Sequence, residues 1–171
     1  IRDREPAAHY VNEHMFAPQY ANQSILLYYT GLTRVAKGIL HEIVRGMFLN
    51  SAAHLAVLED IGANAGTAYE AMLRHDWPGL WQAVRTSWRL NQQLDQGTNP
   101  PEVQAIVDRI ADYAAGLKLL GAGGGGYILI FAKDAAAAGR IRERLNEDPP
   151  AKAARFVQLE VSPTGLEITR S

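Results

Sequence analysis

KLLGAGGGGYILIF, residues 118–131, is the stretch that decides the fold of this chain. Five of the six residues from Gly121 to Gly126 are glycine. Such a run costs backbone entropy and is useful only where the chain must adopt positive φ angles or approach another group closely. Leu117–Leu120 before it has an extended pattern, and Tyr127–Phe131 after it is rich in β-forming residues. The pattern therefore predicts two strands joined by a glycine loop.

The residues around this loop exclude three standard phosphate-binding loops. Gly121, Gly123 and Gly126 match G-x-G-x-x-G, but in dinucleotide-binding proteins that motif opens a helix, whereas a strand follows here. A Walker A loop would carry Lys and then Ser or Thr where Tyr127 and Ile128 stand. The chain contains neither the His-Arg-Asp nor the Asp-Phe-Gly motif of a protein kinase. On glycine content alone, a purely structural hairpin or bulge remains an alternative.

Upstream of the loop we expect one strand and a group of helices. Ile25–Thr30 is a short apolar and aromatic run that ends at Gly31, as in a buried strand. Apolar residues then recur at helical spacing over 33–48, 55–72 and 77–94. Asp76 and Pro78 are start signals for the third of these helices.

A fourth helix is predicted after Thr98-Asn99-Pro100-Pro101-Glu102. Asn99 is expected to accept hydrogen bonds from first-turn amides, and Glu102, three residues later, would complete a capping box. The apolar residues Val103, Ile106 and Ile110 would form its buried side.

Downstream, Asp134 is expected to cap an Ala-rich helix, and residues 156–161 alternate like a half-buried strand. The turn residues 162–165 then predict a last strand over 166–169. Strands and helices in this order predict an α+β domain, with helices packed on an antiparallel sheet. We expect residues 1–24 to be a lead-in from a preceding part of a longer protein, and residues 25–171 to form one domain.

Composition limits the function. The formal net charge is −1 and cysteine is absent, so the chain has no basic footprint for nucleic acid or an anionic membrane, and no disulfide or thiolate metal site. No apolar run approaches the ~20 residues of a bilayer span. The histidines show no metal-binding spacing, so no metal ligand is assigned. We expect a cytoplasmic protein.

The stretch from Lys118 to Gly126 resembles the third conserved motif of the GHMP kinases, which lies on their C-terminal lobe. Two further stretches, Leu27–Arg34 and Gly97–Val157, are similar to the L-fucokinase branch of that superfamily, including the kinase part of bifunctional enzymes that go on to make GDP-fucose. The resemblance covers the chain from about Ile25 to its end. Heptose-phosphate kinases share the Tyr-Thr-Gly and glycine-loop elements.

This resemblance implies the fold and the site. The fold would be a GHMP-kinase C-terminal lobe, a ferredoxin-like core with extra helices. Residues that would support the nucleotide and the phosphate loop of the other lobe are Gly121, Ala122, Gly123, Gly124, Gly125, Gly126 and Lys118. Residues that would line the substrate cleft are Thr30, Gly31, Thr33 and Arg34. The residues alone leave simpler alternatives for these positions. Thr30 or Thr33 could cap a helix, Arg34 could be solvated, and Lys118 could face solvent.

The resemblance also implies the activity. The intact parent would use ATP and Mg²⁺ to phosphorylate a sugar, with L-fucose to L-fucose 1-phosphate as the specific expectation. The triphosphate loop and the catalytic acid of the family are absent from these residues, so no catalytic residue is assigned and this chain alone is expected to be inactive. Its partners would be the missing N-terminal kinase lobe and a small-molecule sugar. The alternatives are a heptose-phosphate kinase lobe and a non-catalytic regulatory module that reuses the lobe.

Overall fold

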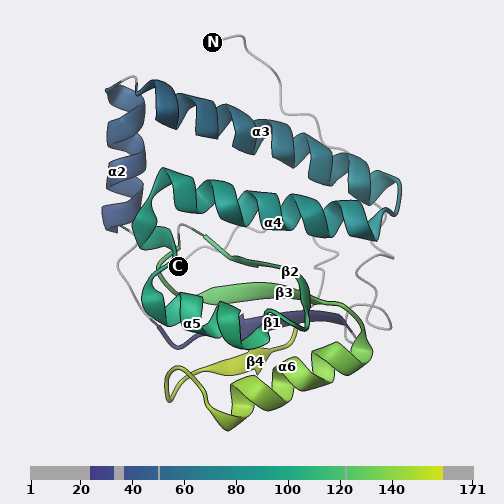
Figure 1. Cartoon of the computed structure of the whole chain (residues 1–171). Coiled ribbons are helices and arrows are strands. Elements are labelled where there is room, and N and C mark those ends of the chain that lie inside the picture. Colours follow the sequence, from purple (N-terminus) through teal and green to yellow (C-terminus); the bar gives the residue numbers. More distant parts are fainter. Residues whose placement is uncertain (1–23, 33–36, 50, 122, 160–171) are drawn as a thin grey trace, which may run out of the picture.

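The computed structural model of the chain describes residues 24–32, 37–49, 51–121 and 123–159 (Figure 1). Several predicted features lie outside the described residues: positions 1–23 of the lead-in, Thr33, Arg34, Ala122 and the strand predicted over 166–169.

The described residues form a four-stranded sheet in the order β2-β3-β1-β4, with antiparallel neighbours throughout. The strands are β1 (Ile25–Tyr29), β2 (Ala114–Leu119), β3 (Tyr127–Ala132) and β4 (Arg155–Val157). Between β1 and β2 run α2 (Lys37–Phe48), α3 (Ala52–Leu73), α4 (Trp77–Leu94), the short 3₁₀ helix η2 (Gln96–Thr98) and α5 (Pro101–Ile110), and α6 (Ala135–Glu147) joins β3 to β4. Two interleaved β-α-β units in this order are a ferredoxin-like core. The predicted fold class, an α+β domain with extra helices, is confirmed.

One face of the sheet carries the main core, under α5 and α6 (Figure 1). Because alternate strand residues point to opposite faces, Leu26 and Tyr28 of β1 turn to the same side as Ile128 and Ile130 of β3, and all four are buried. The helices contribute the buried residues Val103, Ile106, Ile110, Ile141 and Leu145. The Tyr28 hydroxyl donates to the Leu145 carbonyl at 3.4 Å, and burial raises the pKa of that phenol. The predicted apolar sides of α5 and α6 are confirmed.

The opposite face is covered by α4, with α3 as an outer layer (Figure 1). Trp77, Trp81 and Val84 of α4 pack against Ile25 and Phe131 near one end of the sheet. Asn64 of α3 donates to the Ala83 carbonyl of α4 at 2.9 Å. None of the helices in the described part of the chain is long and apolar enough to cross a membrane.

The predicted start signals of two helices are confirmed. Asp76 caps α4, where its Oδ1 accepts from the Gly79 amide at 3.0 Å. Asp134 caps α6 in the same way, accepting from the Ala137 amide at 2.7 Å. Each carboxylate satisfies a first-turn N–H that has no partner within its helix.

The predicted cap at Asn99 is wrong. Pro100 is the N-cap residue of α5, and no side chain makes a cap hydrogen bond there. The helix starts one residue later than a cap at Asn99 requires, and Pro101 at its first position has no N–H to be satisfied. Asn99 instead donates through Nδ2 to Gln92 Oε1 at 2.9 Å and to Gln104 Oε1 at 2.6 Å. Its amide ties α4 to α5.

Three other boundaries and faces differ from the predictions. The strand β2 begins at Ala114 rather than at Leu117, and a bulge at Ala114/Gly116 lets it run through Gly116. The strand β4 spans only three residues, Arg155–Val157. The apolar side of α2 is largely exposed within the described chain, with Phe48 84% exposed.

A double-mutant cycle on Asn99→Ala and Gln104→Ala tests the corrected role of Asn99. The two substitutions should couple by about 1 kcal/mol in free energy of unfolding, because each removes the same side-chain hydrogen bond. Denaturant melts of the four proteins measure this energy. Strictly additive effects would contradict the hydrogen bond between Asn99 and Gln104.

Candidate functional site

The glycine loop between β2 and β3 adopts a backbone that L-residues with a Cβ rarely adopt. The φ angles of Gly121, Gly123, Gly124 and Gly126 are +74°, +104°, +79° and +90°. Each lies in the left-handed region, where only glycine is accommodated without strain. The glycine content therefore reflects the actual path of the chain between the strands.

On one side the loop is held by Thr98, at the junction of η2 and α5. The Gly124 amide donates to the Thr98 carbonyl at 2.9 Å. A Cβ added at Gly123 would lie 2.7 Å from Thr98 Cα, closer than real Cβ contacts. The buried Thr98 was missed by the sequence predictions, because its contact joins residues far apart in the chain.

On the other side the loop is held by the residues that follow β1. The Thr30 amide and the Thr30 hydroxyl both donate to the Gly126 carbonyl, at 2.8 and 3.0 Å. The Gly126 amide donates to the Leu32 carbonyl at 3.1 Å, and the Leu32 amide donates back to Thr30 Oγ1 at 3.2 Å. A Cβ at Gly125 would come within 2.4 Å of the Leu32 carbonyl oxygen. We call this set of contacts the Thr30 clamp.

The contacts on the two sides of the loop use alternate amides. Gly124 and Gly126 donate to Thr98 and Leu32, whereas Gly121, Gly123 and Gly125 make no backbone hydrogen bond within the described residues. Successive amides in such a turn can form a concave donor set for an anion. The loop thus combines N–H groups that bond to the protein with N–H groups that have no backbone partner within the described residues.

The predicted cleft residues Thr30 and Gly31 lie beside the loop, but both face protein. Thr30 is fully buried and its hydroxyl is committed to the clamp. Gly31 has a φ of +70°, and an added Cβ would lie 2.9 Å from Ala151 Cβ and from the Ala154 amide nitrogen. They shape the loop's surroundings, while Thr33 and Arg34 lie outside the described residues.

Lys118 lies on β2 under α4. Its Nζ donates to Ser87 Oγ at 2.6 Å, and burial lowers the pKa of the amine. The neighbouring Leu117 and Leu119 face the opposite side, in the main core. In this chain Lys118 therefore connects the strand that enters the loop to α4.

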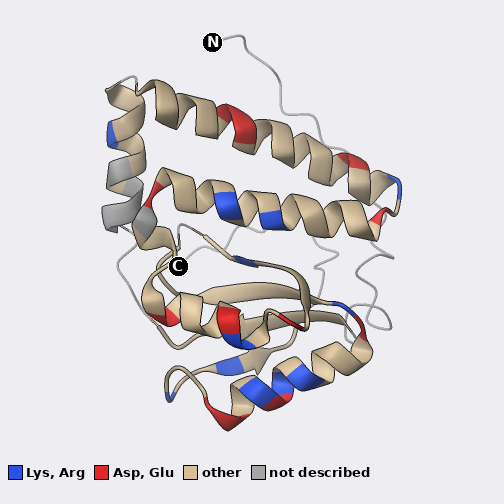
Figure 2. Cartoon of the chain, viewed as in Figure 1, with Lys and Arg blue, Asp and Glu red and all other residues tan. Residues whose placement is uncertain are grey.

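Basic residues lie along α6 (Figure 2), and their side chains contact other described residues. Arg140 pairs with Glu143 at 3.0 Å, Arg142 lies 4.9 Å from the Phe156 ring centroid, and Arg144 donates to the Tyr113 hydroxyl at 3.2 Å. These contacts account for the arginines without a ligand.

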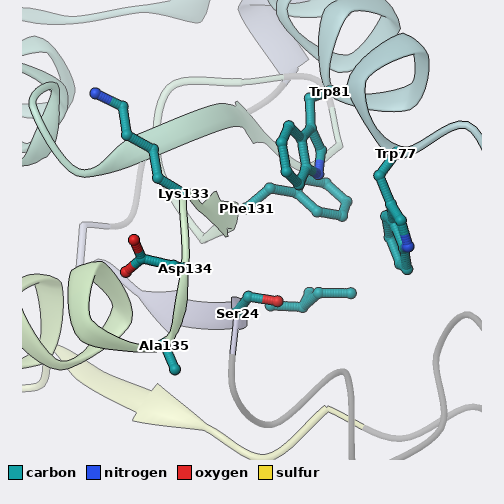
Figure 3. Close-up of a pocket in the computed structure, with 8 residues that line it drawn as sticks. Ser24, Trp77, Trp81, Phe131, Lys133, Asp134 and Ala135 are labelled. Atoms are coloured by element: carbon teal, nitrogen blue, oxygen red, sulfur yellow. The ribbon is translucent and has the colours of Figure 1, made fainter.

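A cavity lies at the other end of the sheet from the loop (Figure 3). Trp77, Trp81 and Phe131 form its wall, and the Ser24 side chain reaches toward it. Lys133 and Asp134 turn away, since Lys133 donates to the Asp112 carbonyl and Asp134 caps α6. Two of its polar lining residues, Lys133 and Asp134, are thus engaged in other contacts, so the glycine loop is the better candidate site.

The loop fits a phosphate better than a metal ion. Its available amides are neutral donors, which suit phosphate oxygens. Among the described residues, no group of three or more His, Cys, Asp or Glu side chains could hold a metal ion. A magnesium ion at this site would need ligands from elsewhere.

Comparison with known proteins places the chain in a family. The family model described as "GHMP kinases C terminal" matches residues 68–151. The chain is 46% identical over 168 residues to the L-fucokinase/L-fucose-1-P guanylyltransferase of Bacteroides fragilis, covering 98% of this chain and 18% of that protein. The chain belongs to the GHMP kinases, as the glycine loop predicted.

Two further similarities are consistent with this family. The chain is 32% identical over 125 residues to the bifunctional fucokinase/GDP-fucose pyrophosphorylase of Arabidopsis thaliana, covering 73% of this chain and 12% of that protein. The fold matches L. major mevalonate kinase, solved with R-mevalonate, at a TM-score of 0.63 and 24% identity, covering 78% of this chain and 42% of that one. This GHMP kinase lobe spans less than a fifth of its two curated relatives.

Replacing Thr30 with Val tests the clamp. The substitution keeps the side-chain volume and removes the hydroxyl, so it should cost about 1–3 kcal/mol of stability, measured by denaturant melts. Thr30→Ser is the matched control, because it keeps the hydroxyl and loses a buried methyl group worth about 1 kcal/mol. A valine variant at least as stable as the serine variant would show that the hydroxyl does not hold the loop.

Alanine at two glycines tests the shape of the loop. Gly125→Ala should destabilise the chain by about 2 kcal/mol more than Gly121→Ala, because its Cβ would overlap the Leu32 carbonyl. An added Cβ at Gly121 meets nothing within 4 Å in the described structure, so only the cost of its positive φ remains. Thermal melts compare the two variants, and equal losses would contradict the packing of Gly125.

Proposed function

We propose that this chain is the C-terminal lobe of an ATP-dependent sugar kinase that converts L-fucose to L-fucose 1-phosphate in the intact protein. The observation that carries the proposal is the 46% identity over 168 residues to a protein named L-fucokinase/L-fucose-1-P guanylyltransferase. The Arabidopsis relative is also named a fucokinase. Both names describe the relatives, and their common activity is the one we extend to this chain.

The glycine loop is the part of this lobe that would serve the reaction. Residues 121–126 would lie at the cleft and support the nucleotide phosphates held by the other lobe. The amides of Gly121, Gly123 and Gly125, which make no backbone bond within the described chain, are the donors best suited to this role. Lys118 would act indirectly, by fixing β2 against α4 where the strand enters the loop.

The sugar would bind between this lobe and the rest of the kinase. Thr30 and Gly31 would shape the cleft by holding the loop in place, and Thr33 and Arg34 follow them in the sequence as candidate sugar contacts. Because phosphoryl transfer depends on positioning and on neutralising charge, the lobe would contribute by orienting the groups that react. When bound, Mg²⁺ would neutralise the ATP phosphates.

Three parts of the activity would come from outside these residues: the triphosphate loop, the catalytic acid and the ligands of the metal ion. An N-terminal lobe of the same protein is therefore the partner that we propose. Cytoplasmic location completes the proposal, since a chain without cysteine suits a reducing compartment.

Kinase assays of this lobe and of the full-length protein that contains it test the proposal. With ATP, Mg²⁺ and L-fucose, the full-length protein should form L-fucose 1-phosphate, while the lobe alone should show no turnover above background, because positioning by both lobes supplies most of the catalysis. A heptose phosphate is the comparison substrate. Preference for the heptose phosphate would refute the choice of sugar, and turnover by the lobe alone would refute the division of labour.

A further inference from the structure

A partly exposed row of side chains crosses the sheet next to the glycine loop. Tyr29 of β1 lies opposite Tyr127 of β3 on one side and opposite Arg155 of β4 on the other. Leu120 follows the last residue of β2, and its amide donates to the Tyr127 carbonyl at 2.8 Å. It therefore adds a fourth member to the row, on the other side of Tyr127 from Tyr29. Because strand residues alternate between faces, Tyr29 and Tyr127 point away from the core that holds Tyr28.

The members of this row support one another. The ring centroids of Tyr29 and Tyr127 are 5.1 Å apart, with the rings tilted by 44°. The Arg155 guanidinium lies 5.1 Å from the Tyr29 ring centroid and is held by a bond to the Ala153 carbonyl at 3.0 Å. Aromatic pairs and cation–π contacts of this kind keep large side chains in fixed positions. The pair is therefore preorganised.

The tyrosine pair remains open to a ligand. Tyr127 is 39% exposed, and within the described residues neither phenol hydroxyl makes a hydrogen bond. Tyr28 and Tyr113 differ, since the hydroxyl of Tyr28 donates to a buried carbonyl and that of Tyr113 accepts from Arg144. At the far end of the same sheet face, Trp77 and Trp81 of α4 cover the strands.

The position of the pair places it near the proposed transfer of phosphate. Tyr127 directly follows Gly126, and Tyr29 directly precedes Thr30, so each tyrosine adjoins one side of the clamp. In phosphoryl transfer the acceptor oxygen must come within about 3–3.5 Å of the phosphorus it attacks. Side chains next to a loop that supports the phosphates are thus within reach of an acceptor.

We infer that Tyr29 and Tyr127 contact the acceptor sugar, Tyr127 through its exposed ring and both through their hydroxyls. This inference rests on the proposed sugar kinase function. A monosaccharide combines a C–H face, which packs on an aromatic ring, with hydroxyls that exchange hydrogen bonds with phenols. The base of ATP could also stack on an aromatic ring, but the triphosphate separates it from the phosphoryl group that is transferred. The row next to the loop is therefore assigned to the acceptor.

Steady-state kinetics of the full-length kinase test the inference. Tyr127→Leu should raise the KM for the sugar at least tenfold and leave the KM for ATP within twofold, because ring and hydroxyl are both lost. Tyr127→Phe and Tyr29→Phe keep the ring and remove one hydroxyl, so each should raise the sugar KM about threefold. Tyr113→Leu is the matched control, a half-buried tyrosine at the opposite end of β2, and should leave both KM values unchanged.

The outcomes separate this inference from its alternatives. A rise in the KM for ATP in Tyr127→Leu would assign the row to the nucleotide, and unchanged KM values with a lowered melting temperature would assign it to packing between the lobes. Either result overturns the inference but does not contradict the proposed sugar kinase function, which the wild-type assay tests separately. If the wild-type protein phosphorylates no sugar, the proposed function fails first, and the inference falls with it.

Discussion

The buried hydroxyl of Thr30 is the interaction on which the site depends. The hydroxyl donates a hydrogen bond to the Gly126 carbonyl and accepts one from the Leu32 amide. One side chain therefore joins the end of β1 to the end of the glycine loop. A buried, fully bonded hydroxyl is worth keeping because removing it leaves polar backbone groups without a partner. Without this clamp, the contact with Thr98 is the one that would still hold the loop among the described residues.

Under the proposed function, the loop would solve a general problem of phosphate recognition. Glycine lets backbone amides approach a phosphate closely, yet a run of glycines is too flexible to hold its donors in place. Here, contacts from η2 and from the end of β1 fix the path of the loop, and they use alternate amides. The amides of Gly121, Gly123 and Gly125 are thereby held in position, although they make no backbone hydrogen bond within the described residues.

The two faces of the sheet have different tasks. The face under α5 and α6 is a continuous apolar core that provides stability. The other face is divided: α4 covers its far half, and the partly exposed row of Leu120, Tyr127, Tyr29 and Arg155 lies beside the loop. The exposed part of α2, including Phe48, adds a second surface that the described residues do not cover. Under the proposed function, such surfaces would be available to the other lobe of the kinase.

Local patterns in the sequence determined the strands beside the glycine loop, the caps at Asp76 and Asp134 and the family, because strand alternation, capping and glycine φ angles act over a few residues. Only the tertiary structure decided the role of Thr30, the bond from Lys118 to Ser87 and the true partners of Asn99, since these contacts join residues between 5 and 96 positions apart. The Asn99 prediction failed because two prolines moved the helix start, and its amide then found side chains on α4 and α5. The row that flanks the loop likewise exists only once β1, β3 and β4 pair, because strand register brings Tyr29, Tyr127 and Arg155 together.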